Sequence, residues 1–421
     1  MLPKSEEFKL AMSAVRARIA AAKRHGTHSG MIDYSGCIYI CDELVRIVNE
    51  TDSLISDGKY RLAFSIDLLV LTNCAKLAST GDSSSGCLND AVYYTNEAIA
   101  KIGSSVLPDR DAAQFIYLSA LKESRNKAYD GWSEFVYDLL KCTATLATAE
   151  NVGKLYALLD EMRDEQAERP YDTYRDLDCQ VRYEALKATE GTAVAAAFVG
   201  DHLQYDGVRR IAIDNAVSGK EYDTAEKLCR ERIAVVNSDD YHWAREWYRR
   251  LYDVFFSAKD TKKQVELAGK LLLDKGDYEY YPVLKALLAA QNRWEAEYPK
   301  LIIELANCIP LERYMAILSE EDEQALLLEQ ISKKPSCIFT YGKKLAKHYP
   351  SEVFSLCADA IHRRTETANT RVIYRQVCSD IKKLVSYGGR DEAHAIIQEL
   401  REKNQRRPAF LEELQYISAK I

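Results

Sequence analysis

The sequence predicts an all-α protein, an irregular α-solenoid of TPR-like (tetratricopeptide-like) helical hairpins. Three observations support this fold class. Apolar residues recur mainly at helical spacing. Short glycine-containing motifs separate several of the predicted helices. No segment shows the alternation of apolar and polar residues that indicates a half-buried strand.

Glycine motifs mark four of the predicted turns. They are Asp57-Gly58-Lys59-Tyr60 before Ala63, Gly219-Lys220-Glu221-Tyr222 before Ala225, Gly276-Asp277-Tyr278, and Gly388-Gly389-Arg390-Asp391-Glu392 before Ala393. We expect the glycine to end one helix in a left-handed conformation and the alanine to let the next helix pack closely. The motifs are unequally spaced, so they do not follow the roughly 34-residue tetratricopeptide period.

The predicted helices can be placed along the chain from the apolar spacing and the breaks. In the segment 32–55, Cys37, Cys41, Leu44 and Val48 share one helical face. Further helices are predicted over 59–78, 87–103, 110–128, 131–148 and 151–169, the last ended by Pro170. From residue 206 onward, short amphipathic segments alternate with breaks. Prolines 310, 335 and 350 lie where first-turn prolines are expected.

We expect residues 1–150 to form N-terminal helical hairpins and residues 151–421 to form a C-terminal helical-repeat superhelix. The two regions could also form one continuous array. A chain of 421 residues is long enough for two or three average domains or for one long array.

Composition narrows the classes of function. The net charge of −7 gives no global basic field for nucleic acid. No run approaches the roughly 20 apolar residues that span a bilayer, and the first 30 residues lack a secretory hydrophobic region. A cytoplasmic location is therefore expected, without a membrane partner. The 11 cysteines are odd in number and scattered, so we interpret them as small buried hydrophobic residues.

Short motifs near both ends of the chain occur in a recognisable order. They are Met31-Ile32-Asp33-Tyr34, Glu43-Leu44, Asp57-Gly58-Lys59-Tyr60, Gly81-Asp82-Ser83-Ser84-Ser85-Gly86, His348-Tyr349-Pro350, Asn369-Thr370-Arg371-Val372-Ile373-Tyr374 and Arg406-Arg407-Pro408-Ala409-Phe410-Leu411-Glu412-Glu413-Leu414. In this order they resemble the helical C-terminal region of bacterial SWIM zinc-finger family proteins. The resemblance covers most of the chain. It implies a helical-repeat module that accompanies a zinc-binding domain associated with nucleic acid.

The chain departs from that family at the zinc motif. The family's C-x-C followed by C-x-H is absent, because no two cysteines lie two residues apart and no histidine lies two residues after a cysteine. The zinc function of the family therefore cannot be transferred to any residue here.

Asp67 is the most unusual single residue of the predicted helix 59–78. Helical spacing places it opposite the polar stripe of Ser65, Thr72 and Lys76, among apolar neighbours. A desolvated carboxylate there could be a general acid or base, or a ligand-binding group with a raised pKa. The favoured alternative is a structural carboxyl bonded to a neighbouring Arg, Tyr or helix N-terminus.

Cys37 and Cys41 lie one helical turn apart and could both bind one metal ion. A tetrahedral site needs two further ligands, and no nearby Cys or His pair supplies them, so core packing is favoured and no metal is predicted. The loop 82–86 could bind an ion or phosphate. It lacks the lysine and glycine spacing of a P-loop, so a connector with a helix cap is favoured.

Two basic segments are candidate contacts for a partner or for nucleic acid. The first contains Arg16, Arg18, Lys23 and Arg24, and the second contains Arg245, Arg249 and Arg250. The second segment interleaves arginine with Trp243 and Trp247, a pattern that can stack bases and neutralise phosphate. The same pattern describes an amphipathic helix with buried aromatic residues. A solvated face for the first segment and core packing for the second are the favoured interpretations.

No common catalytic motif is present: the chain lacks G-x-S-x-G, G-x-G-x-x-G, H-E-x-x-H and a kinase catalytic loop. We therefore expect a non-catalytic helical-repeat scaffold for protein–protein interaction, with no cofactor. The alternative is a nucleic-acid-associated accessory module of a SWIM zinc-finger-type protein. A second alternative, disfavoured, is an enzyme built around Asp67.

Overall fold

The structure is a computed structural model that describes residues 5–165, 173–236 and 241–421. Within these residues all regular elements are helices. Extended backbone is limited to two isolated bridges, His28 with Met31 and Ile32 with Gly81. The predicted all-α fold of α-solenoid type is confirmed. No described helix combines the length and the apolar composition needed to cross a membrane.

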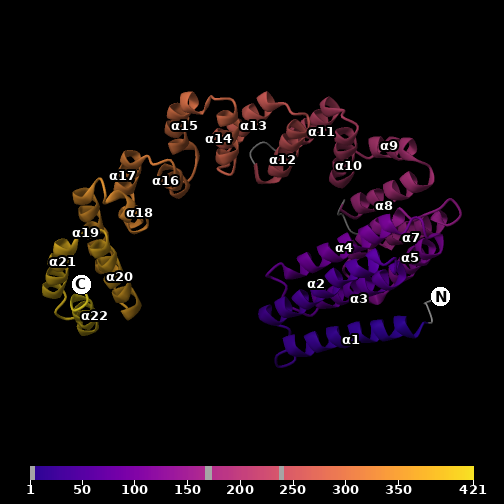
Figure 1. Cartoon of the computed structure of the whole chain (residues 1–421), viewed down its shortest axis with the longest axis horizontal. Helices are drawn as coiled ribbons and strands as arrows, with labels where there is room; N and C mark the ends of the chain where they lie inside the picture. The colour runs from indigo at the N-terminus through magenta and orange to yellow at the C-terminus, as the bar shows by residue number, and fades with distance from the viewer. Residues whose placement is uncertain (1–4, 166–172, 237–240) are drawn as a thin grey trace. The chain divides into compact units, whose positions relative to one another are not determined.

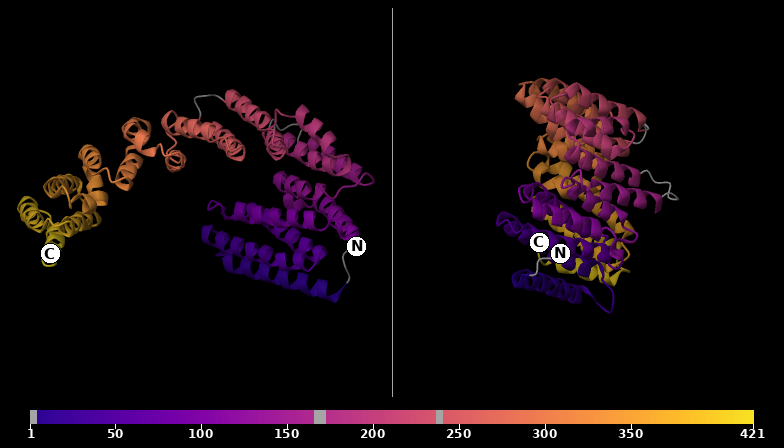
Figure 2. Two further views of the ribbon diagram at one scale, coloured as in Figure 1. Left: turned by 45° about the horizontal axis from the view of Figure 1, so that its top comes forward. Right: turned by 90° about the vertical axis from the view of Figure 1, so that its right-hand side faces the viewer.

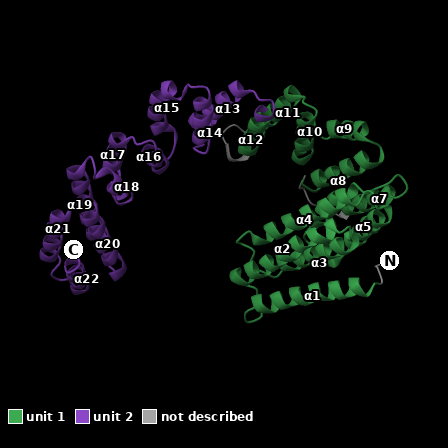
Figure 3. Cartoon of the chain, in the orientation of Figure 1, with its two compact units in different colours: residues 1–254 green, residues 255–421 purple. Residues whose placement is uncertain are grey.

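The chain divides into two compact units, residues 1–254 and residues 255–421 (Figure 3). The helices of the first unit are labelled in Figure 1. They are α1 (Glu6–Gly26), α2 (Tyr34–Ser56), α3 (Tyr60–Ala78), α4 (Cys87–Ser105), α5 (Arg110–Glu123), α6 (Ser133–Ala144), α7 (Val152–Glu165), α8 (Thr173–Thr189), α9 (Thr192–Asp201), α10 (Asp206–Ser218), α11 (Tyr222–Val235) and α12 (Tyr241–Ser257), whose last residues pass the boundary.

The first eight helices pack as two layers. In one layer α1, α3, α5 and α7 follow one another, and in the other α2, α4, α6 and α8 do the same. Between the layers α1 packs on α2, α2 on α3, α3 on α4, α5 on α6 and α7 on α8, and Figures 1 and 2 show the helices as consecutive hairpins. A continuous hydrophobic core runs between the layers through α8. This stacking is how a repeat fold buries the apolar face of each hairpin.

α3 has the most enclosed position in this unit. It packs against α1, α2, α4, α5 and the short 3-10 helix η1 (Lys127–Tyr129). This position explains why its sequence is apolar on nearly every side. One strip of α3, between α1 and α5, is left for solvent and becomes part of the groove described below.

The start of α2 is set by a cap and by a close approach of two backbones. Asp33 Oδ1 accepts a hydrogen bond of 2.8 Å from the Gly36 amide, which satisfies an otherwise unpaired helix donor. Gly36 also lies against the end of α1, where a Cβ atom on it would meet the Gly26 carbonyl oxygen at 2.0 Å. Only glycine leaves room for this contact between α1 and α2.

Three of the four glycine motifs place a glycine in the left-handed region: φ is +71° at Gly58, +66° at Gly276 and +107° at Gly388. The expectation is wrong at the fourth motif. Gly219 has φ of −77° as the C-cap of α10, and Lys220 after it adopts the left-handed conformation at +61°. The left-handed residue follows the C-cap, and here the glycine lies one position too early.

The second unit contains α13 (Thr261–Leu273), α14 (Tyr280–Ala290), α15 (Trp294–Cys308), α16 (Leu311–Glu320), α17 (Gln324–Lys333), η2 (Pro335–Cys337), α18 (Ile338–Leu345), α19 (Pro350–Thr367), α20 (Arg371–Ser386), α21 (Arg390–Lys403) and α22 (Pro408–Ser418). Neighbouring helices pack in sequence order, and α22 also packs on α20. Pro335 and Pro350 lie in first turns as expected. Pro310 instead lies one residue before α16, as its N-cap.

Several helix ends differ from the sequence-based bounds; for example, the helix predicted over 131–148 is α6, which ends at Ala144. The helix predicted over 110–128 ends at Glu123, and residues 127–129 form η1 instead, capped by Asn126 Oδ1 on the Ala128 amide at 3.0 Å. The helix predicted over 151–169 is α7, and its predicted stop at Pro170 lies outside the described residues. The division expected after residue 150 stays a prediction; the helices on either side of it, α5 to α8, pack together in one unit.

Candidate functional site

An open groove of about 790 Å³ lies between α1, α3 and α5 in the first unit. Its walls are successive helices of one layer, and η1 follows the last of them. The lining residues are Met12, Arg16, Arg61, Ser65, Leu68, Leu69, Thr72, Asp111, Gln114, Phe115, Leu118, Ser119, Lys122, Glu123 and Asn126. Because three packed helices carry these side chains, the groove is preformed.

The centre of the groove is apolar. Leu68 and Leu69 of α3 are partly buried beside Phe115 of α5, and all three pack against the hydrophobic core. Leu118, one turn after Phe115, is 37% exposed and offers its side chain to solvent. The Arg61 guanidinium lies over the Phe115 ring, 5.7 Å from its centroid, so a charged group borders this apolar floor.

Charges line the edges of the groove unequally. Arg16, Arg61 and Lys122 form no ion pair within the described residues. Glu123, in contrast, accepts hydrogen bonds from Thr72 Oγ1 at 3.0 Å and from Asn126 Nδ2 at 2.6 Å. The cationic side chains are thus available for an external anionic group, whereas one of the two acidic groups is already satisfied from within.

The structure does not gather the four basic residues of the first segment. Arg16 lines the groove, but Arg18 is held by Glu43 at 2.9 Å and by Glu50 at 2.5 Å, and these ion pairs raise its pKa. Lys23 is half-buried, and burial followed by the nearby charge of Lys76 lowers its pKa. Arg24 is exposed. Of the four, Arg16 is the residue positioned to contact a ligand in the groove.

The second basic segment lies on α12. Trp247 is only 2% exposed, and the guanidinium of Arg210 lies over its ring at 5.7 Å. Arg250 pairs with Asp214 at 2.7 Å. Arg245 and Arg249 are not free side chains either. The side chain of Trp243, also part of the predicted base-stacking pattern, lies outside the described residues.

Asp67 is fully buried on the side of α3 that faces α2, away from the groove. Its Oδ2 lies 3.3 Å from Thr51 Oγ1, and its Oδ1 has no hydrogen-bond partner among the described residues. Burial raises its pKa well above the usual range, opposed by the Thr51 hydrogen bond. No Arg, Tyr or helix N-terminus supplies the expected partner in the described structure.

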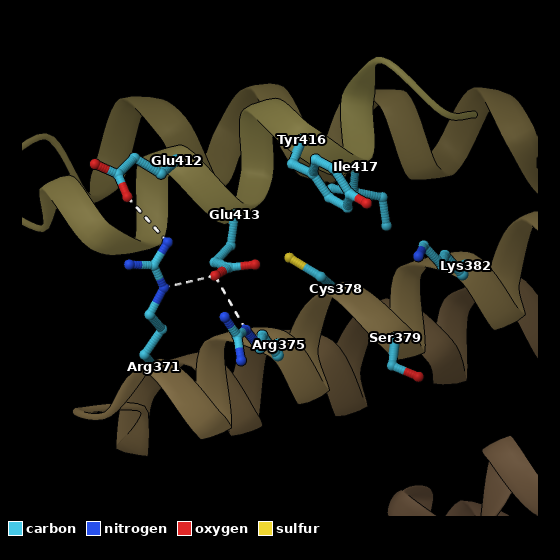
Figure 4. A pocket seen from close by; sticks show the side chains of 9 residues that line it. All are labelled: Arg371, Arg375, Cys378, Ser379, Lys382, Glu412, Glu413, Tyr416 and Ile417. Atoms are coloured by element: carbon cyan, nitrogen blue, oxygen red, sulfur yellow. Dashed lines mark hydrogen bonds and ion pairs between the residues drawn. The ribbon is translucent and has the colours of Figure 1, made fainter.

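A second pocket, of about 610 Å³, lies between α20 and α22 in the other unit. Figure 4 shows that ion pairs cross it: Arg371 bonds to Glu412 and Glu413, and Arg375 also bonds to Glu413. The facing charges neutralise one another, and these ion pairs hold α20 and α22 together across the pocket. It offers a ligand less unpaired charge than the groove in the first unit.

The groove residues Arg61, Phe115, Leu118 and Lys122 were not identified from sequence. They occur at helical spacing among other apolar and charged residues, and no motif distinguishes them. One feature of the sequence could have indicated the groove. The helix 59–78 is apolar on nearly every side, so it either packs against many neighbours or leaves apolar surface exposed.

No protein-family model matches the chain, and no curated protein matches it. The resemblance to SWIM zinc-finger proteins therefore stays a prediction. One solved structure matches, a circular tandem repeat protein with novel repeat topology and enhanced subunit contact surfaces. It shares 10% identity over 98% of this chain and 95% of its own, with a TM-score of 0.22, too low to establish a common fold.

Proposed function

We propose that the protein is a non-catalytic helical-repeat scaffold that binds a segment of a partner protein in the groove between α1, α3 and α5. One observation carries this proposal: three cationic side chains without an ion-pair partner in the described structure border an apolar floor with an exposed leucine. The partner segment that fits is a polypeptide with apolar anchors flanked by acidic side chains.

Apolar burial would supply most of the affinity. A partner side chain seated on Phe115 and Leu118 removes apolar surface of both molecules from water, at about 25 cal/mol per Å². Such central, well-packed contacts dominate most protein interfaces. The preformed groove adds to affinity, because little of the scaffold needs to be ordered on binding.

Charge would supply orientation and selectivity. Arg16 on α1, Arg61 on α3 and Lys122 on α5 come from three helices, so an acidic residue on the ligand is attracted from several sides. Complementary charge speeds encounter and disfavours basic segments. This term weakens as salt rises.

The two alternatives receive less support. Asp67 faces α2 and does not line the groove, so the groove gives it no access to a bound substrate. Base stacking by α12 would require a buried Trp247 to become exposed. All eleven cysteines are free thiols, a state typical of the cytoplasm, and we place the scaffold there.

Selection from a displayed library of random peptides tests the proposal, with the full chain as bait. We expect enriched peptides to combine apolar and acidic residues. We expect Leu118→Glu to weaken their binding about 30-fold, the effect of losing roughly 2 kcal/mol at a central contact. Leu107→Glu is the matched control, because Leu107 is also an exposed leucine but lies outside the groove.

Two results would overturn the proposal. One is a selection that enriches no peptide whose binding depends on Leu118. The other is tight binding of a single-stranded oligonucleotide, lost with Arg16→Glu and falling steeply with salt, which would favour the nucleic-acid alternative. A charge reversal at Arg16 that weakens the acidic peptides and spares the oligonucleotide supports the protein-binding groove.

A further inference from the structure

Three cysteine thiols from two helices converge at one point of the first unit. Cys37 and Cys41 lie one turn apart on α2, and Cys87 is the first residue of α4. Their Sγ atoms all lie within 4.8 Å of one another, and the Cys37 and Cys87 sulfurs are 3.8 Å apart. Among the described residues this is the one group of three or more potential metal ligands that meets at this distance.

The fold brings the third thiol to the first two. α2 packs directly on α4, and the loop before α4 is tied to the start of α2 by the bridge between Ile32 and Gly81. Gly86 adopts φ of +82° at the end of this loop, which turns the chain into α4 at Cys87. The pair on α2 therefore gains a ligand from a position 50 residues away in sequence.

The sulfur geometry suits a tetrahedral thiolate site. A zinc–sulfur bond is about 2.3 Å long, so two thiolates at a tetrahedral angle are separated by roughly 3.8 Å. The Cys37–Cys87 separation already has this value. A disulfide bond requires a sulfur–sulfur distance of about 2.05 Å, which these thiols do not have.

The cluster is buried on one side and open on the other. Cys37 and Cys41 are almost fully enclosed, whereas Cys87 is partly exposed. A pocket of about 380 Å³ reaches Cys41 and Cys87, and Asp90 and Tyr94 of α4 also line it. This pocket gives an ion a path to the thiols and leaves room for a fourth ligand, such as water.

We propose that Cys37, Cys41 and Cys87 bind one thiophilic divalent ion of the zinc class, with the fourth coordination position open to the pocket. Three thiolates and a divalent ion leave a net charge of −1. Cys87 begins α4, where the positive end of the helix dipole stabilises negative charge. This site is independent of the groove and of the function proposed for it.

Binding must displace protons from the thiols. Burial raises the pKa of Cys37 to about 11 in the metal-free chain, and burial also raises the pKa of Cys41. Binding of the ion therefore releases the thiol protons that it displaces.

Titration of the reduced, chelator-treated full chain with Co²⁺ and Zn²⁺ tests the site. We expect one Co²⁺ per chain, with an intense thiolate-to-metal charge-transfer band and the visible bands of tetrahedral coordination, both abolished by one equivalent of Zn²⁺. Cys87→Ser should weaken binding at least about 100-fold, the upper range for losing a supporting contact at a metal site. Cys308→Ser, a partly buried thiol in the other unit, is the matched control and should change nothing.

A second readout does not depend on a variant. Zn²⁺ should protect Cys87 from a thiol-alkylating reagent, as measured by peptide mass spectrometry, while the reactivity of Cys308 stays unchanged. The proposal is overturned if the wild type binds Co²⁺ no tighter than Cys87→Ser, or if Zn²⁺ leaves the alkylation of Cys87 unaffected. A Co²⁺ complex without charge-transfer bands would also overturn it, because such bands report thiolate ligation.

Discussion

Thr51 Oγ1 lies 3.3 Å from Asp67 Oδ2 in the buried contact between α2 and α3. The Thr51 hydroxyl makes a shorter bond, of 2.7 Å, to the Val48 carbonyl oxygen, so its single proton is already engaged. Thr51 therefore donates only a long bond to Asp67 Oδ2, and Asp67 Oδ1 has no partner among the described residues. Burial, the largest influence, raises the pKa of Asp67 because it removes the water that would solvate a carboxylate, and the Thr51 hydrogen bond only partly opposes this.

The raised pKa of Asp67 predicts that stability decreases as pH rises. The folded chain holds this proton more tightly than the unfolded chain, whose aspartate pKa is about 3.9. The stabilising contribution is therefore complete below that pH and is lost as pH rises through the folded pKa. Asp67→Asn should remove this dependence and make the protein more stable at pH 7, by about 1–3 kcal/mol. Urea unfolding over a pH series measures both effects.

Asp178→Asn is the contrasting control. Asp178 is also buried, but it is paired with the Arg182 guanidinium at 2.7 Å, so its loss should destabilise the protein at neutral pH. If Asp67→Asn also destabilised the chain at pH 7 as Asp178→Asn does, Asp67 would be a charged, paired group and the neutral-carboxyl interpretation would be wrong.

The space around two helical glycines predicts that replacing each by alanine has opposite effects on stability. Gly36→Ala would place a methyl group 2.0 Å from the Gly26 carbonyl oxygen, so the helices must separate, at a cost of about 1–3 kcal/mol or more. Gly153 in α7 has no neighbour within 4 Å of its Cβ position. Gly153→Ala should therefore stabilise the chain by about 0.5–1 kcal/mol. Thermal and urea unfolding of the two variants would show opposite shifts.

The turn at Lys220 predicts a stabilising substitution. A side chain at φ of +61° carries backbone strain, so Lys220→Gly should gain up to about 1 kcal/mol. Gly58→Ala is the reverse case and should lower stability. Gly58 has φ of +71° and no atom lies within 4 Å of the new methyl group, so any loss of stability comes from backbone strain alone. Equal stability of Lys220→Gly and wild type in urea would show that the turn carries no strain.

Glu413 predicts a pH- and salt-dependent contact between α20 and α22. The Arg371 hydrogen bond lowers its pKa, so its contribution is present above the unfolded value of about 4.3 and is lost as pH falls through the folded pKa. Glu413 is 12% exposed with two arginine partners, whereas Glu412 is 64% exposed with one. Glu413→Gln should destabilise the protein by up to about 1 kcal/mol at low salt, and more than Glu412→Gln. The difference should shrink in high salt; a persistent difference would exclude an electrostatic origin.

Local features of the fold could be predicted because they depend on neighbouring residues. The helix predicted over 59–78 is α3, and Gly58 has the expected left-handed backbone, since periodicity and turn chemistry are local. The predictions failed where two local conformations have similar energies. Lys220 replaces Gly219 as the left-handed residue, and the helix expected to reach residue 128 ends at Glu123.

The candidate sites could not be predicted in the same way. Arg16 lies in the groove while Arg18, two residues later, is paired with Glu43 and Glu50 on α2. Their different roles depend on how α1 packs, and two arginines in a basic run look equivalent in sequence. The pair Cys37 and Cys41 was visible, but its third partner required the packing of α4.

Residues close together in the chain set the helices, most of their turns and the all-α class, because the spacing of apolar residues and the conformational needs of glycine act over a few residues. Tertiary structure decided three things: that a groove lies between α1, α3 and α5, that the Asp67 carboxyl is buried against Thr51, and that three cysteine thiols lie close together. These outcomes depend on contacts between residues far apart in the chain. No local pattern encodes those distances, so they follow only from the packing of the helices.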